Sequence, residues 1–128
     1  MRELEFLTPA IIEQLHADSL VLFGGSAGVR DRGLMESALA SARNTHLYGH
    51  GDVFDIAASY AFHIAEAQAY LDGNKRTAVA AALTFLKGND VQLPIDDSKI
   101  YNAMIAIAEK QMTKAGLAAM FRKHAQIK

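Results

Sequence analysis

The chain has 128 residues, of which 51% are hydrophobic; it contains no cysteine and carries a formal net charge of −1 at pH 7. This length and composition predict one folded domain over residues 1–128 and exclude disorder, disulfides and a thiolate zinc site. The balanced charge disfavours a nucleic-acid-binding module and electrostatic attachment to a membrane, because both need a basic surface.

The amino terminus, MRELEFLTPAIIEQL, lacks the apolar run of a signal peptide. The longest apolar run of the chain, AVAAALTFL, is too short to span a bilayer. We therefore expect a cytoplasmic protein that contacts no membrane, which agrees with the absence of cysteine.

Helix signals begin with Thr8 and Pro9, which are typical of an N-cap and a first helical residue. This first helix is expected to end at Gly24, and a second helix is expected over residues 31–42, capped by the aspartate at its start. The polar, glycine-containing segment RNTHLYGHGDV, residues 43–53, is predicted to be a loop or flap.

A third helix is predicted over residues 55–71. Its polar residues step by three or four positions and form one stripe: Asp55, Ser59, His63 and Glu66. The remaining residues are nearly all apolar, so most of the circumference should be buried. A fourth helix is expected over residues 74–87, and it too is apolar almost all round after Thr77.

Residues 91–95, VQLPI, predict a short extended segment, at most an edge strand because it contains Pro94. A fifth helix is expected from Asp97 or Ser98, and a sixth after the N-cap Thr113. The predicted fold class is therefore all-α, a compact bundle of about six helices with a flap loop.

The stretch QAYLDGNKR, residues 68–76, joins the two most apolar helices. Lys75 and Arg76 fall at the start of a helix, where the helix dipole is already positive, so they cost free energy unless an anion binds there. Gly73 lets the backbone approach such a ligand, and Asn74 can cap the helix or orient the ligand. The arrangement is typical of a phosphate-binding site.

Asp72, directly before this glycine, can neutralise the two cations or hold a Mg²⁺ ion that bridges phosphate oxygens. The alternative is a tight turn between helices, because Asp-Gly is common in turns, with Lys75 and Arg76 simply solvated. The residues alone support a phosphate-binding site and a tight turn about equally. The two cations at the start of a buried helix favour the binding site slightly.

The segment YLDGNKRTA resembles the signature of the Fic/Doc (Fido) family, in its Doc, or death-on-curing, branch. The pattern of that branch is His-x-Phe-x-Asp-(Gly or Ala)-Asn-Lys-Arg. The likeness extends to GGSAGVRDRGLMESALASARN, to YGHGDVFDIAASYAFHIA and to NKRTAVAAALTFLKGNDVQL, so that roughly the first hundred residues fit.

This resemblance implies an all-α enzyme that uses ATP and Mg²⁺ and transfers part of the nucleotide to a hydroxyl of a target protein. Most Fic members transfer AMP and have Gly at the position of Lys75. Doc members have Lys there and act as kinases that transfer the γ-phosphate. For Doc the target is elongation factor Tu, so translation stops, and a small antitoxin neutralises the enzyme.

The resemblance also implies a role for each residue of the motif. These roles are Mg²⁺ binding by Asp72, an anion hole at Gly73 and Asn74, and phosphate binding by Lys75 and Arg76. Tyr70 stands where the family usually has Phe, a conservative change. Residues 43–53 would be the flap that docks the backbone of the target.

The catalytic His of the family should stand four residues before Asp72, where this chain has Gln68. An amide can orient a hydroxyl but cannot accept its proton, and loss of a general base costs about 10²–10⁴-fold in rate. Because phosphoryl transfer depends mostly on positioning and electrostatics, some activity can remain. Gln68 is expected off the polar stripe, facing either the core or a ligand.

The other histidines of the chain are weak candidates for the general base that Gln68 cannot provide. His63 falls on the polar stripe and is expected to face solvent, and Glu66 is expected to be a surface carboxylate. His46 and His50 lie in the predicted flap, where a role in catalysis or as a metal pair is a weaker reading than ordinary loop residues. The sequence gives no signal for His16.

Overall fold

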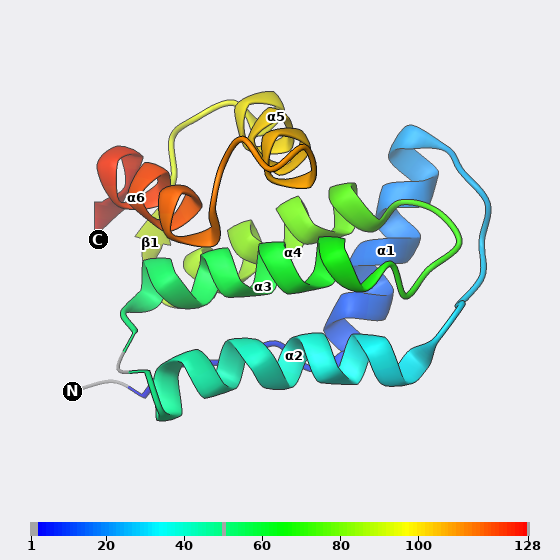
Figure 1. Ribbon diagram of the computed structural model, residues 1–128, viewed down its shortest axis with the longest axis horizontal. Helices are drawn as coiled ribbons and strands as arrows, with labels where there is room; N and C mark the ends of the chain where they lie inside the picture. The colour runs from blue at the N-terminus through cyan, green and yellow to red at the C-terminus, as the bar shows by residue number, and fades with distance from the viewer. Residues whose placement is uncertain (1–2, 50, 128) are drawn as a thin grey trace.

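The structure is a computed structural model that describes residues 3–49 and 51–127. In these residues the chain forms six helices and one short β-ladder, which confirms the predicted all-α class (Figure 1). The helices are α1 (Pro9–Phe23), α2 (Arg32–Leu47), α3 (Val53–Ala67), α4 (Asn74–Gly88), α5 (Asp97–Ala108) and α6 (Lys114–His124). None of the helices in these ranges has both the length and the apolar composition needed to cross a membrane.

Side-chain N-caps set the start of five of the six helices. The capping residues are Thr8, Asp31, Asp52, Asp96 and Thr113, each accepting a hydrogen bond from a backbone amide of its first turn. The predicted caps Thr8, Asp31 and Thr113 are therefore confirmed. Helix α4 differs, because it starts after Gly73 and has no side-chain cap.

Helix α3 lies at the centre of the bundle and packs against α2, α4, α5 and α6, while α1 packs against α4 (Figure 1). Most of its circumference is buried, as predicted. The largest buried side chains of α3 and α4 include Tyr60, Ile56, Ile64, Phe85 and Leu86. The polar stripe of α3 also reaches the interior, since Ser59 is fully buried and its Oγ lies 3.1 Å from Thr45 Oγ1.

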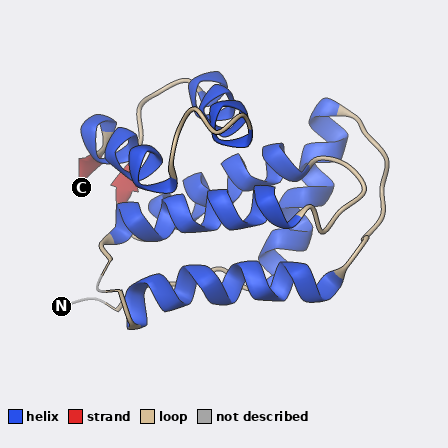
Figure 2. Ribbon diagram, in the orientation of Figure 1, coloured by secondary structure: helices blue, strands red, loops and turns tan. Residues whose placement is uncertain are grey.

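The β-ladder joins β1 (Val91–Gln92) to β2 (Gln126–Ile127) in antiparallel register (Figure 2). The prediction of a short edge strand at residues 91–95 is thus correct in its first two residues. Its partner after α6 was not predicted, because a strand of two residues carries no alternating pattern.

Residues 43–47 are helical, so the predicted flap over residues 43–53 is wrong in extent. Helix α2 continues to Leu47, and Thr45 Oγ1 donates to Ser41 O at 3.1 Å within it. The connection to α3 spans residues 48–52, of which residue 50 lies outside the described residues. This connection precedes the first residue of α3 and Gln68 follows the last, so the two are separated by the length of the helix, about 22 Å at 1.5 Å per helical residue.

The third helix was predicted over residues 55–71, but α3 begins at Val53 and ends at Ala67. Asp52 starts it early with a capping box in which the Asp55 carboxylate accepts from the Asp52 amide at 3.0 Å. Gln68 ends it in the left-handed region, at φ 48° and ψ 45°. Gln68 is therefore the C-cap of α3 and not a helical residue.

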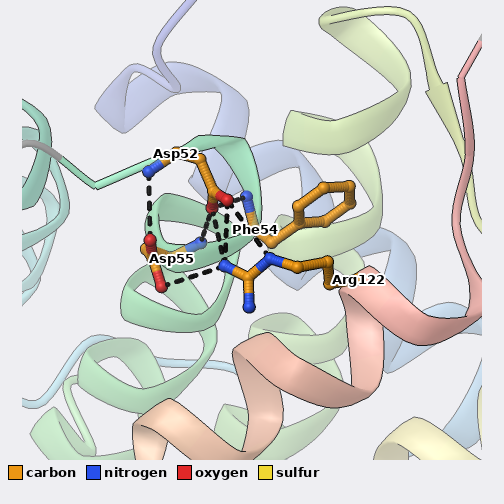
Figure 3. A network of polar contacts seen from close by, with 4 residues as sticks. All are labelled: Asp52, Phe54, Asp55 and Arg122. Carbon is orange, nitrogen blue, oxygen red and sulfur yellow. Dashed lines mark hydrogen bonds and ion pairs between the residues drawn. The ribbon is translucent and has the colours of Figure 1, made fainter.

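A polar network ties the start of α3 to α6 (Figure 3). The guanidinium of Arg122 donates to both carboxylate oxygens of Asp52, with the shortest contact at 2.9 Å, and lies 3.4 Å from Asp55. Burial raises the pKa of Asp52, but hydrogen bonds from the Asp55 amide and from Arg122 outweigh it and lower the pKa overall. The network fixes the end of α3 that lies far from the motif.

Candidate phosphate-binding site at the start of helix α4

The motif loop, residues 68–73, connects α3 to α4 and lies against the loop of residues 24–31 between α1 and α2 (Figure 1). Val29 and Tyr70 form an antiparallel bridge. The Arg30 amide donates to Ala69 O at 2.6 Å, and the Leu71 amide donates to Gly28 O at 3.1 Å. The segment beside the motif is thus 24–31, and not the predicted flap.

The side chain of Asn74 closes the motif loop on itself. Its Oδ1 accepts from the Tyr70 amide at 3.1 Å, and its Nδ2 donates to Tyr70 O at 3.0 Å. Asn74 therefore orients the loop instead of capping α4. Among the described residues, no side chain caps the start of α4.

His16 of α1 contacts the motif loop at two places, the Tyr70 ring and the backbone of Asp72. It is buried on α1, with 6% of its surface exposed. Its ring stacks on that of Tyr70, with centroids 3.6 Å apart and an interplanar angle of 7°. Its Nε2 lies 2.8 Å from the backbone oxygen of Asp72. The sequence carries no signal for these contacts of His16.

The carboxylate of Asp72 is exposed and points toward the loop of residues 24–31. Its Oδ2 accepts a hydrogen bond from the Ser26 amide at 3.1 Å. Gly25 lies against the same carboxylate at φ 119°, and a Cβ placed there would come within 3.1 Å of Oδ2. The glycine therefore permits this close approach of the two loops.

Lys75 and Arg76 occupy the first turn of α4, which contains no acidic residue. The Arg76 guanidinium lies between two aromatic rings, 4.2 Å from the centre of Phe23 and 3.8 Å from that of Tyr101. This cation–π contact holds Arg76 from α1 and α5. Arg76 is thus not a freely solvated side chain, contrary to the turn alternative.

A cavity of about 500 Å³ opens over the start of α4. Its lining includes all six residues predicted for the site, namely Gln68, Asp72, Gly73, Asn74, Lys75 and Arg76. Phe23 and Tyr101 also line it and were not predicted, because they are distant in sequence and carry no local pattern. No histidine lines this cavity among the described residues.

Gln68 lines this cavity and is exposed. It also lines a neighbouring cavity of about 550 Å³, together with Lys75, Lys110 and Lys114. Of the two orientations that the sequence left open, the core position does not hold, because Gln68 is exposed. Its left-handed backbone is one that histidine tolerates more readily than most residues do.

The other candidate bases lie elsewhere. His63 is half-buried, and its Nε2 lies 3.1 Å from Lys114 Nζ, so the predicted exposure to solvent is only partial. Burial and the Lys114 charge lower its pKa. The ring centroids of His46 and Phe6 lie 5.7 Å apart. His50 lies outside the described residues.

The chemistry of the donors decides which cation the site suits. Over the described residues, no three His, Cys, Asp or Glu side chains gather in a way that could hold a metal. A single carboxylate, Asp72, faces the cavity. This donor set fits Mg²⁺, which usually takes one or two carboxylates and completes its shell with phosphate oxygens and water. A metal held by Asp72 would therefore need its remaining ligands from an anion or from water.

The chain is similar to known proteins of one family. Residues 6–86 match the Fic/DOC family. Over 79 residues the chain is 46% identical to "Toxin Doc" of Mycolicibacterium smegmatis (strain ATCC 700084 / mc(2)155), covering 59% of this chain and 60% of that protein. Over 118 residues it is 27% identical to "Protein kinase doc" of Escherichia phage P1, covering 91% of this chain and 93% of that protein. The chain therefore belongs to the Fic/Doc family.

Proposed function

We propose that this protein is a Doc-like toxin that binds ATP with Mg²⁺ at the start of α4 and transfers phosphate to a hydroxyl of a target protein. The observation that carries the proposal is the uncapped start of α4. It is the one helix start without a side-chain cap among the described residues, and Lys75 and Arg76 occupy its first turn.

Electrostatics give this helix start its preference for an anion. Free amides and the helix dipole place partial positive charge there, and each further cation costs about 0.3–1 kcal/mol. A bound phosphate reverses the sign of these contributions and accepts hydrogen bonds from the amides. Asn74 and His16 hold the loop in place before any ligand arrives.

Each residue of the motif has its own role in this proposal. Gly73 and Asn74 present the amides of the anion hole, while Lys75 and Arg76 bind phosphate oxygens. Asp72 would hold Mg²⁺, which neutralises charge on the phosphates when bound. Lys75 supports transfer of phosphate over transfer of AMP, because most Fic proteins transfer AMP and have Gly at this position, whereas Doc members have Lys. The printed name of the phage relative, a protein kinase, points the same way.

Elongation factor Tu is the target that the family implies, and an antitoxin is the partner that it implies. We propose that the target approaches the loop of residues 24–31, because residues 48–52 lie at the far end of α3. Residues 1–128 are proposed to form one cytoplasmic domain.

Transfer of label from γ-labelled ATP to purified elongation factor Tu tests this function, with wild type and the Gln68→His variant compared. Wild type is expected to transfer slowly, and Gln68→His about 10²–10⁴-fold faster, since the variant restores a general base. Lys75→Gln in the Gln68→His background is the matched control and should lose transfer. No transfer by either wild type or Gln68→His would refute the kinase.

The second candidate is a non-catalytic or degenerate member of the family that binds a nucleotide or a partner protein. Gln68 favours it, because an amide cannot take the proton of the target hydroxyl. This candidate predicts that expression of wild type leaves growth unchanged, whereas Gln68→His arrests growth. Arrest by wild type itself would exclude it.

A further inference from the structure

The peptide that joins Asp72 to Gly73 has a defined orientation beneath the cavity. A trans peptide points its carbonyl and its amide in opposite directions, and the chain contains no cis peptide among the described residues. The Asp72 oxygen points inward, where it lies 2.8 Å from His16 Nε2. The Gly73 amide therefore points away from His16, and Gly73 is one of the residues that line the cavity.

The opposite orientation of this peptide is accessible to the chain. Gly73 has φ 78° and ψ 15°, and a residue without Cβ adopts either sign of φ at little cost. A flipped peptide would turn the Asp72 oxygen into the cavity. A carbonyl oxygen there would repel the phosphate that the Gly73 amide otherwise attracts. Some contact must therefore select the observed orientation.

His16 is placed to make that selection. A carbonyl oxygen only accepts hydrogen bonds, so Nε2 of His16 must carry the proton. The ring cannot turn freely, because it is buried and stacked on Tyr70 at 3.6 Å. His16 also closes the space beside Gly73, since a Cβ at that glycine would lie 3.5 Å from the imidazole.

We propose that His16 is a positioning residue that holds the Asp72–Gly73 peptide with its amide toward the cavity, and so makes the start of α4 an anion site. The inference deepens the proposed function and rests on it for the identity of the anion. The orientation of the peptide, however, is a property of the free protein.

Nuclear magnetic resonance of the free protein tests the orientation directly. In wild type, His16 is expected to carry its proton on Nε2. His16→Phe keeps the stack on Tyr70 but loses the donor, so the Gly73 amide resonance should move or split in two. His16→Gln offers an amide donor at a similar reach and should return the resonance toward its wild-type position. Ile12→Val, one turn earlier on α1 and also buried, is the matched control and should leave it unchanged.

The affinity for Mg–ATP, measured by titration, is the second test. His16→Phe is expected to bind about tenfold more weakly than wild type, the factor that corresponds to one hydrogen bond. The proposal is overturned if wild-type His16 lacks the Nε2 proton, if Gly73 is unchanged in His16→Phe, or if Ile12→Val moves it as much. Failure of wild type to bind Mg–ATP would refute the proposed function instead, and the free-protein comparison would still decide the role of His16.

Discussion

The side-chain amide of Asn74 pairs with both backbone groups of Tyr70, accepting from its amide at 3.1 Å and donating to its carbonyl at 3.0 Å. Because Tyr70 is buried, these two groups have little access to water. The pairing fixes the motif loop before a ligand binds. It also leaves the first amides of α4 without a side-chain cap.

Replacing Asn74 with Ala should destabilise the protein by about 1–3 kcal/mol, because two buried backbone groups lose their partners. Asn74→Asp keeps the acceptor for the Tyr70 amide but places an oxygen against the Tyr70 carbonyl, so it should also lose stability. Urea unfolding followed by circular dichroism measures both losses. If Asn74→Ala unfolds at the wild-type urea concentration, the loop is not held by this side chain.

Tyr101 should matter for ligand affinity through Arg76. Tyr101→Leu removes one ring of the aromatic pair around the guanidinium, at a cost of about 0.5–2 kcal/mol in cation–π contact. We expect weaker Mg–ATP binding by calorimetry, because Arg76 loses its fixed position. Tyr101→Phe keeps the ring and is the matched control. Equal affinity of the Leu and Phe variants would show that Arg76 needs no aromatic support.

The free energy of unfolding should depend on pH through His63. Burial and the charge of Lys114 lower the pKa of His63 in the folded protein, while Glu66 opposes them. The unfolded chain therefore takes up this proton at a higher pH than the folded chain does. Stability should fall as the pH drops below the ordinary value of 6.5, and the loss should level off below the folded-state pKa.

Urea unfolding at pH 7.5 and at pH 5 checks this dependence. His63→Gln removes the titrating group and should lose less stability than wild type between these pH values. Lys114→Met removes one cause of the lowered pKa of His63. Its loss of stability between the two pH values should therefore be smaller than that of wild type and larger than that of His63→Gln. The same pH dependence in wild type and His63→Gln would contradict the assignment.

Arg122 should contribute modestly to stability. Its side chain and that of Asp52 are 46% and 49% exposed, so solvent screens the ion pair and Arg122→Met should cost under about 1 kcal/mol, less at high salt. Asp52→Ala should cost about 1–2 kcal/mol, because it also removes the N-cap of α3. Asp52→Asn keeps a capping oxygen and separates the two effects. A larger loss for Arg122→Met than for Asp52→Ala in urea unfolding would reverse this order.

Helix starts were predictable from the sequence because their signals are local. Thr8, Asp31 and Thr113 cap the helices that they were expected to cap. Helix ends were less predictable. The polar residues after Ala42 suggested a loop, yet Thr45 contacts buried Ser59, and this tertiary contact accompanies five further residues of α2, which ends at Leu47.

The candidate site was predictable where its residues are consecutive. Residues 72–76 and Gln68 line one cavity, as their spacing suggested. The residues that support them come from other helices, namely His16 and Phe23 from α1 and Tyr101 from α5. A histidine on an apolar helix face is usually a core residue, so only the fold brings His16 under Asp72.

A crystal structure of the protein with Mg²⁺ and a non-hydrolysable ATP analogue tests the central claim most directly. The account predicts that the γ-phosphate lies at the start of α4, against the Gly73 amide and Lys75, with Mg²⁺ on Asp72 and Gln68 beside the cavity mouth. Occupation of a different hollow, such as the cavity of about 550 Å³ between α4 and β1, would contradict it. An α-phosphate in place of the γ-phosphate at Lys75 would contradict phosphate transfer.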